Sequence, residues 1–241
     1  MEYFGKSDVG RKRSKNEDAF VLQPLWDDNH LLAVVIDGVG GSILGKLAAD
    51  LSRMQLIEYL QERPEGDLME ALNSAVLNAN NYVYAYAAGD GACVLTAAVI
   101  DCAENKIYVC HVGDTRLYSY ADGKLSKLTR DHSVVGPLEE DGTLTEEEAM
   151  QHPRRNLITR SVGRDKVYEP ERFLFSQVYP FTSPVTFLLC SDGLYDMVRS
   201  VEISEVLARP CSAQDKVEPL ISMANEAGGK DNVTVLVVEV K

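Results

Sequence analysis

The sequence lacks any long apolar run, and its acidic residues outnumber its basic ones. Its 241 residues include 24 lysines and arginines against 37 aspartates and glutamates, which gives a formal net charge of -13. No stretch approaches the roughly 20 apolar residues that a membrane span requires, and Met1 to Lys6 lack the apolar core of a signal peptide. A nonspecific nucleic-acid or acidic-membrane binder needs a basic footprint, which this balance does not provide. We therefore expect a soluble, cytoplasmic protein that binds neither nucleic acid nor membrane.

Cysteine is scarce and scattered, and the sequence contains neither repeats nor low-complexity tracts. The five cysteines are odd in number and lie mostly within apolar runs. This is typical of small buried thiols in a reducing cytosol. A composition of 45% hydrophobic and 25% charged residues is that of an ordinary globular protein. We predict a single domain over residues 1–241 and a monomer.

The pattern of apolar residues predicts strands and helices in separate groups. Short apolar runs bounded by turn residues predict strands at 20–24, 30–36, 94–100, 106–112, 116–120, 124–128, 173–176, 185–190 and 233–240. Helical spacing and capping residues predict helices from 43 to about 62, 67 to about 86, 145–150, 200–207, and 212 to about 228, the last with Pro219 inside it. This grouping favours an α+β fold with mainly antiparallel sheets.

Aspartates recur at the ends of the predicted strands. Asp37, Asp114 and Asp192 each follow an apolar run, and Asp231 precedes one. Any one of them alone is better explained as a turn former. If Asp37, Asp192 and Asp231 converge, their repulsion requires a cation between them, and oxygen ligands without a Cys or His cluster favour Mg2+ or Mn2+ over zinc. Two such ions could activate a water for attack at phosphorus.

A basic segment followed by two acids lies near the N-terminus. Arg13 could bind a phosphate dianion through its guanidinium, and the adjacent Glu17 and Asp18 could order water near a metal ion. The alternative is a solvated loop of mixed charge, which composition alone favours.

Six motifs in a fixed order resemble the metal-dependent protein phosphatase family, type 2C, in its bacterial branch. They are DVGxxRxxNED from Asp8, DGVGG from Asp37, VGDTR from Val112, LTRDHS from Leu128, SDGL from Ser191 and GGKDNVTV from Gly228. The segment 152–163 also resembles the flap region of that branch. The order and spacing of the motifs agree from about residue 4 to residue 240.

The resemblance implies a four-layer α-β-β-α sandwich with two central antiparallel sheets flanked by helices, and a flap at about 131–163. It implies a protein-serine/threonine phosphatase that acts on phosphoserine and phosphothreonine proteins, opposes a cognate kinase and uses Mg2+ or Mn2+. The resemblance also implies a role for each site residue.

Asp37 would bridge two ions, with the carbonyl oxygen of Gly38 as a further ligand, and Asp192 and Asp231 would complete the coordination shell of one ion. Glu17, with Asp18 behind it, would act on the other ion largely through water, and Asp114 and Asp192 would hold a weaker third ion. Arg13 would bind the substrate phosphate, and Asn232 would support Asp231 or the nearby water.

Three features of the sequence depart from the family pattern. Ser42 stands where the bacterial branch has a histidine that is a proposed general acid, and a neutral serine is a poor proton donor. We therefore expect aryl phosphates to be hydrolysed better, by comparison, than alkyl phosphates such as phosphoserine. Lys46 replaces a common acidic residue, and Gly91-Ala92-Cys93 replaces Gly-Thr-Thr.

Two rival functions stay open at this point. A phosphoprotein-binding regulatory module would keep metal and phosphate affinity after the loss of the histidine, and a hydrolase of small phosphoesters would use the same metals and arginine. Among the remaining candidates, His152 is the best substitute acid. His111 is expected in the core, His132 is expected to order its own turn, and Cys190 is expected to be a buried structural thiol.

Overall fold

The computed structural model describes residues 1–40, 43–63 and 66–241, which form two compact units. The terminal unit comprises Met1–Asn16, Gly113–Thr159 and Ser183–Lys241, and the central unit comprises Glu17–Val112 and Arg160–Thr182. Each unit contains one five-stranded antiparallel sheet together with helices. The predicted α+β class with two antiparallel sheets is therefore confirmed, whereas the assignment of one domain stays a prediction.

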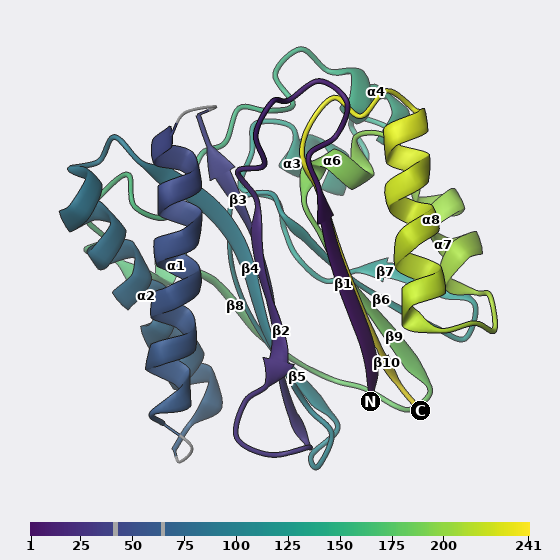
Figure 1. Cartoon of the computed structure of the whole chain (residues 1–241), viewed down its shortest axis with the longest axis horizontal. Helices are drawn as coiled ribbons and strands as arrows, with labels where there is room; N and C mark the ends of the chain where they lie inside the picture. Colours follow the sequence, from purple (N-terminus) through teal and green to yellow (C-terminus); the bar gives the residue numbers. More distant parts are fainter. Residues whose placement is uncertain (41–42, 64–65) are drawn as a thin grey trace. The chain divides into compact units, whose positions relative to one another are not determined.

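The sheet of the terminal unit joins the two ends of the chain. Its strands, in spatial order, are β1 (Glu2–Asp8), β10 (Val233–Val240), β9 (Val185–Cys190), β6 (Arg116–Ala121) and β7 (Lys124–Lys127). The helices of this unit are α3 (Gly136–Glu140), α4 (Glu146–Gln151), α6 (Asp192–Tyr195), α7 (Ser200–Leu207) and α8 (Ala213–Glu226). Because β1 pairs with β10, the N- and C-termini lie side by side (Figure 1).

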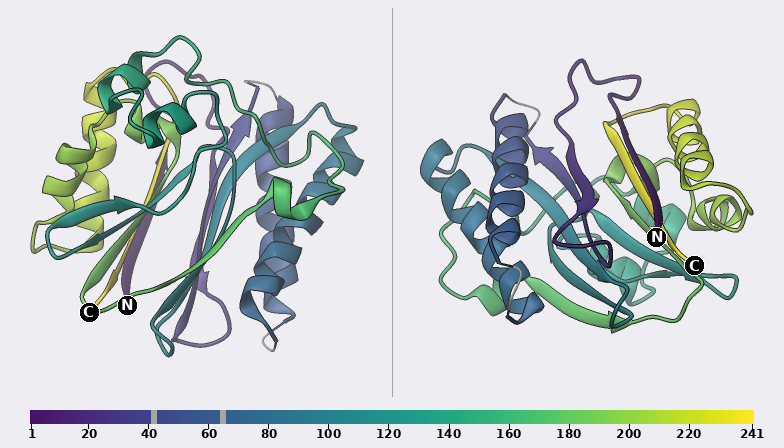
Figure 2. Two further views of the ribbon diagram at one scale, coloured as in Figure 1. Left: turned by 180° about the vertical axis from the view of Figure 1, so that it is seen from behind. Right: turned by 60° about the horizontal axis from the view of Figure 1, so that its bottom comes forward.

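The sheet of the central unit carries a pair of long helices. Its strands, in spatial order, are β2 (Ala19–Pro24), β3 (His30–Val39), β4 (Ala92–Asp101), β5 (Lys106–Val112) and β8 (Phe175–Pro180). The helices are α1 (Ile43–Gln61), α2 (Leu68–Ala87) and the short α5 (Pro170–Phe173). The expected pairing of α1 with α2 is confirmed, because the two helices run side by side along the sheet in every view (Figures 1 and 2).

Each unit has its own apolar core. In the central unit, Leu56 of α1 and Leu72 of α2 are fully buried in one cluster with Val34 of β3. In the terminal unit, Val217 and Leu220 of α8 are buried with residues of β10 and β9. Helix α8 is continuous through Pro219, since the packing of its apolar face outweighs the one N–H that proline lacks.

Some elements differ from the prediction. Strand β3 runs on to Val39, so Asp37 lies inside the strand rather than at its end. Strand β1 was not predicted, because its residues are mostly half-exposed and include charged side chains at a sheet edge. Within the described ranges, no helix is both long and apolar enough to cross a membrane.

Candidate active site

Asp192 and Asp231 lie at the same end of two neighbouring strands. Because β9 and β10 are antiparallel, the end of β9 meets the start of β10, and Ser191 and Thr234 exchange two hydrogen bonds there, Ser191 N to Thr234 O (3.1 Å) and Thr234 N to Ser191 Oγ (3.0 Å). Gly193 makes this approach possible, since a Cβ at this residue would stand 1.9 Å from the carbonyl oxygen of Asn232. Two carboxylates are thus presented by tightly packed turns.

Arg13 reaches the same place from the loop that follows β1. Its Nη2 donates to Asp231 Oδ2 at 2.8 Å, while Asp231 Oδ1 accepts from the backbone N–H of Asn232. The side-chain amide of Asn232 donates to the carbonyl oxygens of Val9 (3.0 Å) and Lys15 (2.9 Å), and these two contacts fix the loop at both ends. Asn232 therefore positions both the arginine and the aspartate.

Arg13, Asp192 and Asp231 line one pocket of the terminal unit. Its further members, for which no role was predicted, include Arg155, Asp196 and Lys230. Arg155 Nε donates to Asp196 Oδ2 at 2.8 Å. Burial raises the pKa of Asp196, and the hydrogen bond from Arg155 opposes that rise. Asp196 lies four residues after Asp192, so the helical turn of α6 was the signal that could have identified it.

Asp114 is buried beside this pocket, in a second one that it shares with Asp192. Burial raises the pKa of its carboxyl to about 7, the nearby carboxylate of Asp131 adds to this rise, and Arg116 opposes it. The hydroxyl of Tyr195 donates to the Asp114 carbonyl oxygen at 2.9 Å. A carboxyl in a pocket whose pKa is raised by burial and by a neighbouring carboxylate is a candidate functional group.

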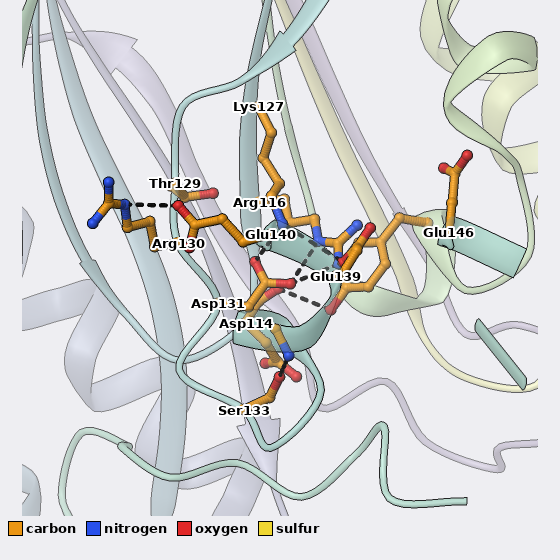
Figure 3. A network of polar contacts seen from close by, with 12 residues as sticks. Asp114, Arg116, Lys127, Thr129, Arg130, Asp131, Ser133, Glu139, Glu140 and Glu146 are labelled. Carbon is orange, nitrogen blue, oxygen red and sulfur yellow. Dashed lines mark hydrogen bonds and ion pairs between the residues drawn. The ribbon is translucent and has the colours of Figure 1, made fainter. Parts of the chain in front are cut away.

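Arg116 is the centre of a buried ionic network around the start of the flap (Figure 3). It donates to Asp131 and to Glu139 of α3, and its guanidinium stacks on the ring of Tyr195 with 3.8 Å from Cζ to the ring centroid. Lys127 Nζ lies 3.6 Å from each of the two carboxylates. The network joins the flap segment to β6 and β7, an arrangement that the sequence did not predict.

The central unit carries the other predicted site residues. The pairing of Ala19 with Ile36 brings Glu17 and Asp18, in the loop directly before β2, beside Asp37 and Gly38 in the last residues of β3. Only glycine fits at residue 38, because a Cβ there would stand 2.6 Å from the backbone of Gly45 and 2.9 Å from the Glu17 carbonyl oxygen.

Lys46 and Cys93, two of the departures from the family pattern, also lie in the central unit. Lys46 Nζ donates to the carbonyl oxygen of Asp18 at 2.9 Å and so supports the loop that carries the acids. Cys93 is fully buried with its sulfur 3.2 Å from Ser52 Oγ, which agrees with a packing role. Ser42 lies outside the described residues.

The donor set suits a hard divalent cation. In the terminal unit, Asp192 and Asp231 present carboxylate oxygens to one pocket. In the central unit, Gly38 has no side chain, so its backbone lies close to the carbonyl oxygen of Glu17. Across residues 1–40, 43–63 and 66–241, no three His, Cys, Asp or Glu side chains form a group that could hold an ion. The convergence of Asp37 with Asp192 and Asp231 thus stays a prediction.

The remaining histidines and the thiol candidate have structural contacts. His111 is fully buried and its Nδ1 lies 2.9 Å from Thr96 Oγ1, as expected of a core histidine. His132 Nδ1 accepts from the N–H of Gly113, so it ties the flap to the Asp114 turn, and its expected role in its own turn stays a prediction. His152 Nδ1 accepts from the N–H of Arg154. Cys190 is fully buried and burial raises its pKa to about 12, as expected of a structural thiol.

Comparison with known proteins agrees with this arrangement. A family model described as Protein phosphatase 2C matches residues 6–236. The chain belongs to the protein phosphatase 2C family. The predicted family is thereby confirmed.

The phosphatase 2C chain is similar to bacterial serine/threonine phosphatases along its whole length. It is 33% identical over 244 residues to the phosphatase stp of Listeria monocytogenes, covering 97% of this chain and 94% of that protein. It is 35% identical over 246 residues to PstP of Mycobacterium tuberculosis, covering all of this chain but 45% of that protein.

Solved structures match the fold equally well. The crystal structure of M. tuberculosis PstP superposes with a TM-score of 0.86 at 32% identity and covers 99% of this chain and 98% of that one. The S. agalactiae serine/threonine phosphatase gives a TM-score of 0.87 at 30% identity, with 100% and 99% covered. A structure of the PstP catalytic domain, 30% identical with a TM-score of 0.84 and covering 99% of this chain and 98% of that one, contains two manganese ions.

Proposed function

We propose that this protein phosphatase hydrolyses phosphoserine and phosphothreonine in proteins, with Mg2+ or Mn2+ as cofactor. The observation that supports the proposal most directly is the contact of Arg13 with Asp231 in a pocket that Asp192 also lines. An arginine fork beside two carboxylates combines a ligand for phosphate with ligands for a divalent ion. The named relatives are serine/threonine phosphatases, which supports the same function.

In this proposal, the residues of the terminal unit bind and orient the phosphate. Arg13 donates two N–H groups to the phosphate dianion, and its contact with Asp231 holds the guanidinium in place before substrate arrives. Asn232 keeps the Arg13 loop and the Asp231 carboxylate in register. No side chain forms a covalent intermediate, in agreement with the buried, protonated Cys190.

The cofactor would be held by the predicted ligands Asp37, Gly38, Asp192 and Asp231, with Glu17 and Asp18 acting largely through water and Asp114 at a weaker third ion. Bound divalent ions supply Lewis acidity, which lowers the pKa of water and neutralises charge that develops at phosphorus. The presence of two manganese ions in the PstP structure supports this assignment. We further propose a cytoplasmic monomer that opposes a cognate serine/threonine kinase.

The two rivals are less well supported. A regulatory module that binds phosphoproteins without turnover, and a hydrolase of small phosphoesters, would both keep Arg13 and the aspartates. The relatives that match nearly the full chain carry the names of protein phosphatases, which favours turnover of phosphoproteins over either rival.

The test measures hydrolysis of an aryl phosphate and of a phosphothreonine peptide with Mn2+, with EDTA and in Asp192→Asn. We expect EDTA to abolish turnover and Asp192→Asn to lower it about 100-fold, since a neutral amide is a poor ligand for a hard cation. Asp122→Asn is the matched control, because Asp122 lies in the β6–β7 turn at φ 51°, which asparagine tolerates. Activity that persists in EDTA would refute the metal mechanism. Metal binding without turnover of either substrate would favour the regulatory module.

A further inference from the structure

Basic side chains surround the predicted phosphate pocket in a chain that is otherwise strongly acidic. We propose that this basic rim binds acidic residues that flank the phosphorylated residue, so that the enzyme prefers phosphoproteins with acidic phosphorylation sites. The rim consists of seven residues of the terminal unit: Arg11, Lys12, Arg13, Lys15, Arg154, Arg155 and Lys230. The inference rests on the proposed function, because it assigns a substrate class to the same site.

Pocket lining and backbone contacts place five of the seven rim residues beside one pocket. Arg13, Arg155 and Lys230 line the pocket that contains Asp192 and Asp231. The N–H groups of Arg11 and Lys12 both donate to the carbonyl oxygen of Gly229, at 2.8 and 3.1 Å, so this part of the loop runs directly beside Lys230. Three chain segments that are far apart in sequence thus bring their basic residues together.

The basic residues of the rim are exposed to solvent, whereas the acidic residues lie inside the pocket. All rim residues except the half-buried Arg155 are exposed. The acids of the pocket have partners or a predicted use: Asp231 contacts Arg13, Asp196 contacts Arg155, and Asp192 and Asp231 are predicted metal ligands. Bound divalent ions would neutralise the two ligands, and the exposed charge around the phosphate would then be positive.

The positive charge of the rim favours binding of an acidic segment of the partner protein. The chain carries a net charge of -13, so an acidic polypeptide is repelled by the protein as a whole and attracted where basic residues gather. A phosphorylated residue anchored at Arg13 would have neighbours about 3.3 to 3.6 Å apart along an extended chain, and these neighbours would meet the exposed basic residues of the rim. Aspartate or glutamate at those places would gain contacts that a neutral residue lacks.

The test compares two phosphothreonine peptides that differ only in flanking residues, Asp and Glu in one and Ser and Ala in the other, with Mn2+. We expect kcat/KM to be about 10-fold higher for the acidic peptide at 50 mM salt and only about 2-fold higher at 0.5 M, because salt screens exposed charges. Lys12→Glu/Lys15→Glu should abolish or invert this ratio. Lys124→Glu, an exposed reversal in the β6–β7 hairpin, should keep it.

The outcomes separate the two proposals. If both peptides are hydrolysed with equal kcat/KM, or if the ratio is unchanged in Lys12→Glu/Lys15→Glu, the proposed binding of acidic residues by the rim is refuted. The proposed phosphatase function is unaffected by either result. Failure to hydrolyse either peptide or the aryl phosphate refutes the proposed function itself. An equal loss of the ratio in Lys124→Glu would mean that the ratio follows the overall charge of the protein rather than the charge of the rim, and this also overturns the inference.

Discussion

Arg116 donates to the same oxygen of Asp131, Oδ2, through both Nε (2.9 Å) and Nη2 (2.6 Å), and both side chains are almost completely buried. The pair joins β6 to the first residue of the flap (Figure 3). A buried guanidinium that loses its carboxylate cannot recover its hydration, so the two groups depend on each other.

We predict that Asp131→Ala lowers the free energy of unfolding by about 3 kcal/mol. This value is at the lower end of the range for breaking a buried ion pair, because Glu139 would still contact Arg116 in the variant. Urea denaturation followed by circular dichroism measures the change. Glu140→Ala is the control, since its pair with Arg130 is exposed and should contribute less than about 1 kcal/mol. Equal losses in the two variants would contradict the structural role of the buried pair.

A second prediction concerns the close approach of Gly193 to Asn232. Gly193→Ala places a Cβ 1.9 Å from the carbonyl oxygen of Asn232, and the turns carrying Asp192 and Asp231 must separate. We expect Mn2+ affinity, measured by calorimetry, to fall at least about 10-fold, because ligand geometry controls metal binding. Gly123→Ala has a strained φ of +76° but no atom within 4 Å, and should cost about 1 kcal/mol of stability with unchanged Mn2+ affinity. Unchanged affinity in both variants would show that the packing of the turns does not matter to the site.

The third prediction concerns the thiols. Burial raises the pKa values of Cys93, Cys110 and Cys190 to about 12. Since the thiolate is the nucleophile and these thiols stay protonated well above pH 8, iodoacetamide at pH 8 should leave them unmodified until denaturant is added. Cys102 and Cys211 are partly exposed and should react in the native protein, Cys102 more slowly because burial also raises its pKa. Mass spectrometry locates the labels, and native labelling of Cys190 with loss of activity would contradict its structural assignment.

Local sequence was sufficient for most of the fold. The strands around Val34 and Val235 and the paired helices α1 and α2 were predictable because a run of apolar residues, or their helical spacing, is itself the signal. Strand β1 was missed because an edge strand with alternating exposure carries only a weak pattern. The extension of β3 past Asp37 was missed because the ladder with β4, rather than local composition, maintains it.

The site was predictable only in part, and for a similar reason. Asp192, Asp231 and Arg13 were identified by their motifs, and the structure places them at one pocket. The contacts of Arg155 with Asp196 and of Arg116 with Glu139 join segments that are 41 and 23 residues apart. Such pairs depend on tertiary packing and have no local signature. The rim shares this origin, because the N–H of Lys12 donates to the carbonyl oxygen of Gly229, the residue before Lys230.

The two hydrogen bonds from the Asn232 amide to Val9 and Lys15 make the intervening loop a closed ring of fixed circumference. Apart from Gly10, where φ is +80° and a Cβ would stand 2.2 Å from the carbonyl oxygen of Asp231, such a ring constrains the length of the loop more than its side chains. One residue inserted or deleted between Val9 and Lys15 would break one of the two contacts and displace Arg13 by up to the length of a residue, about 3.3 to 3.6 Å. The predicted phosphate ligand Arg13 is therefore carried on a segment whose length is fixed by the two contacts of Asn232.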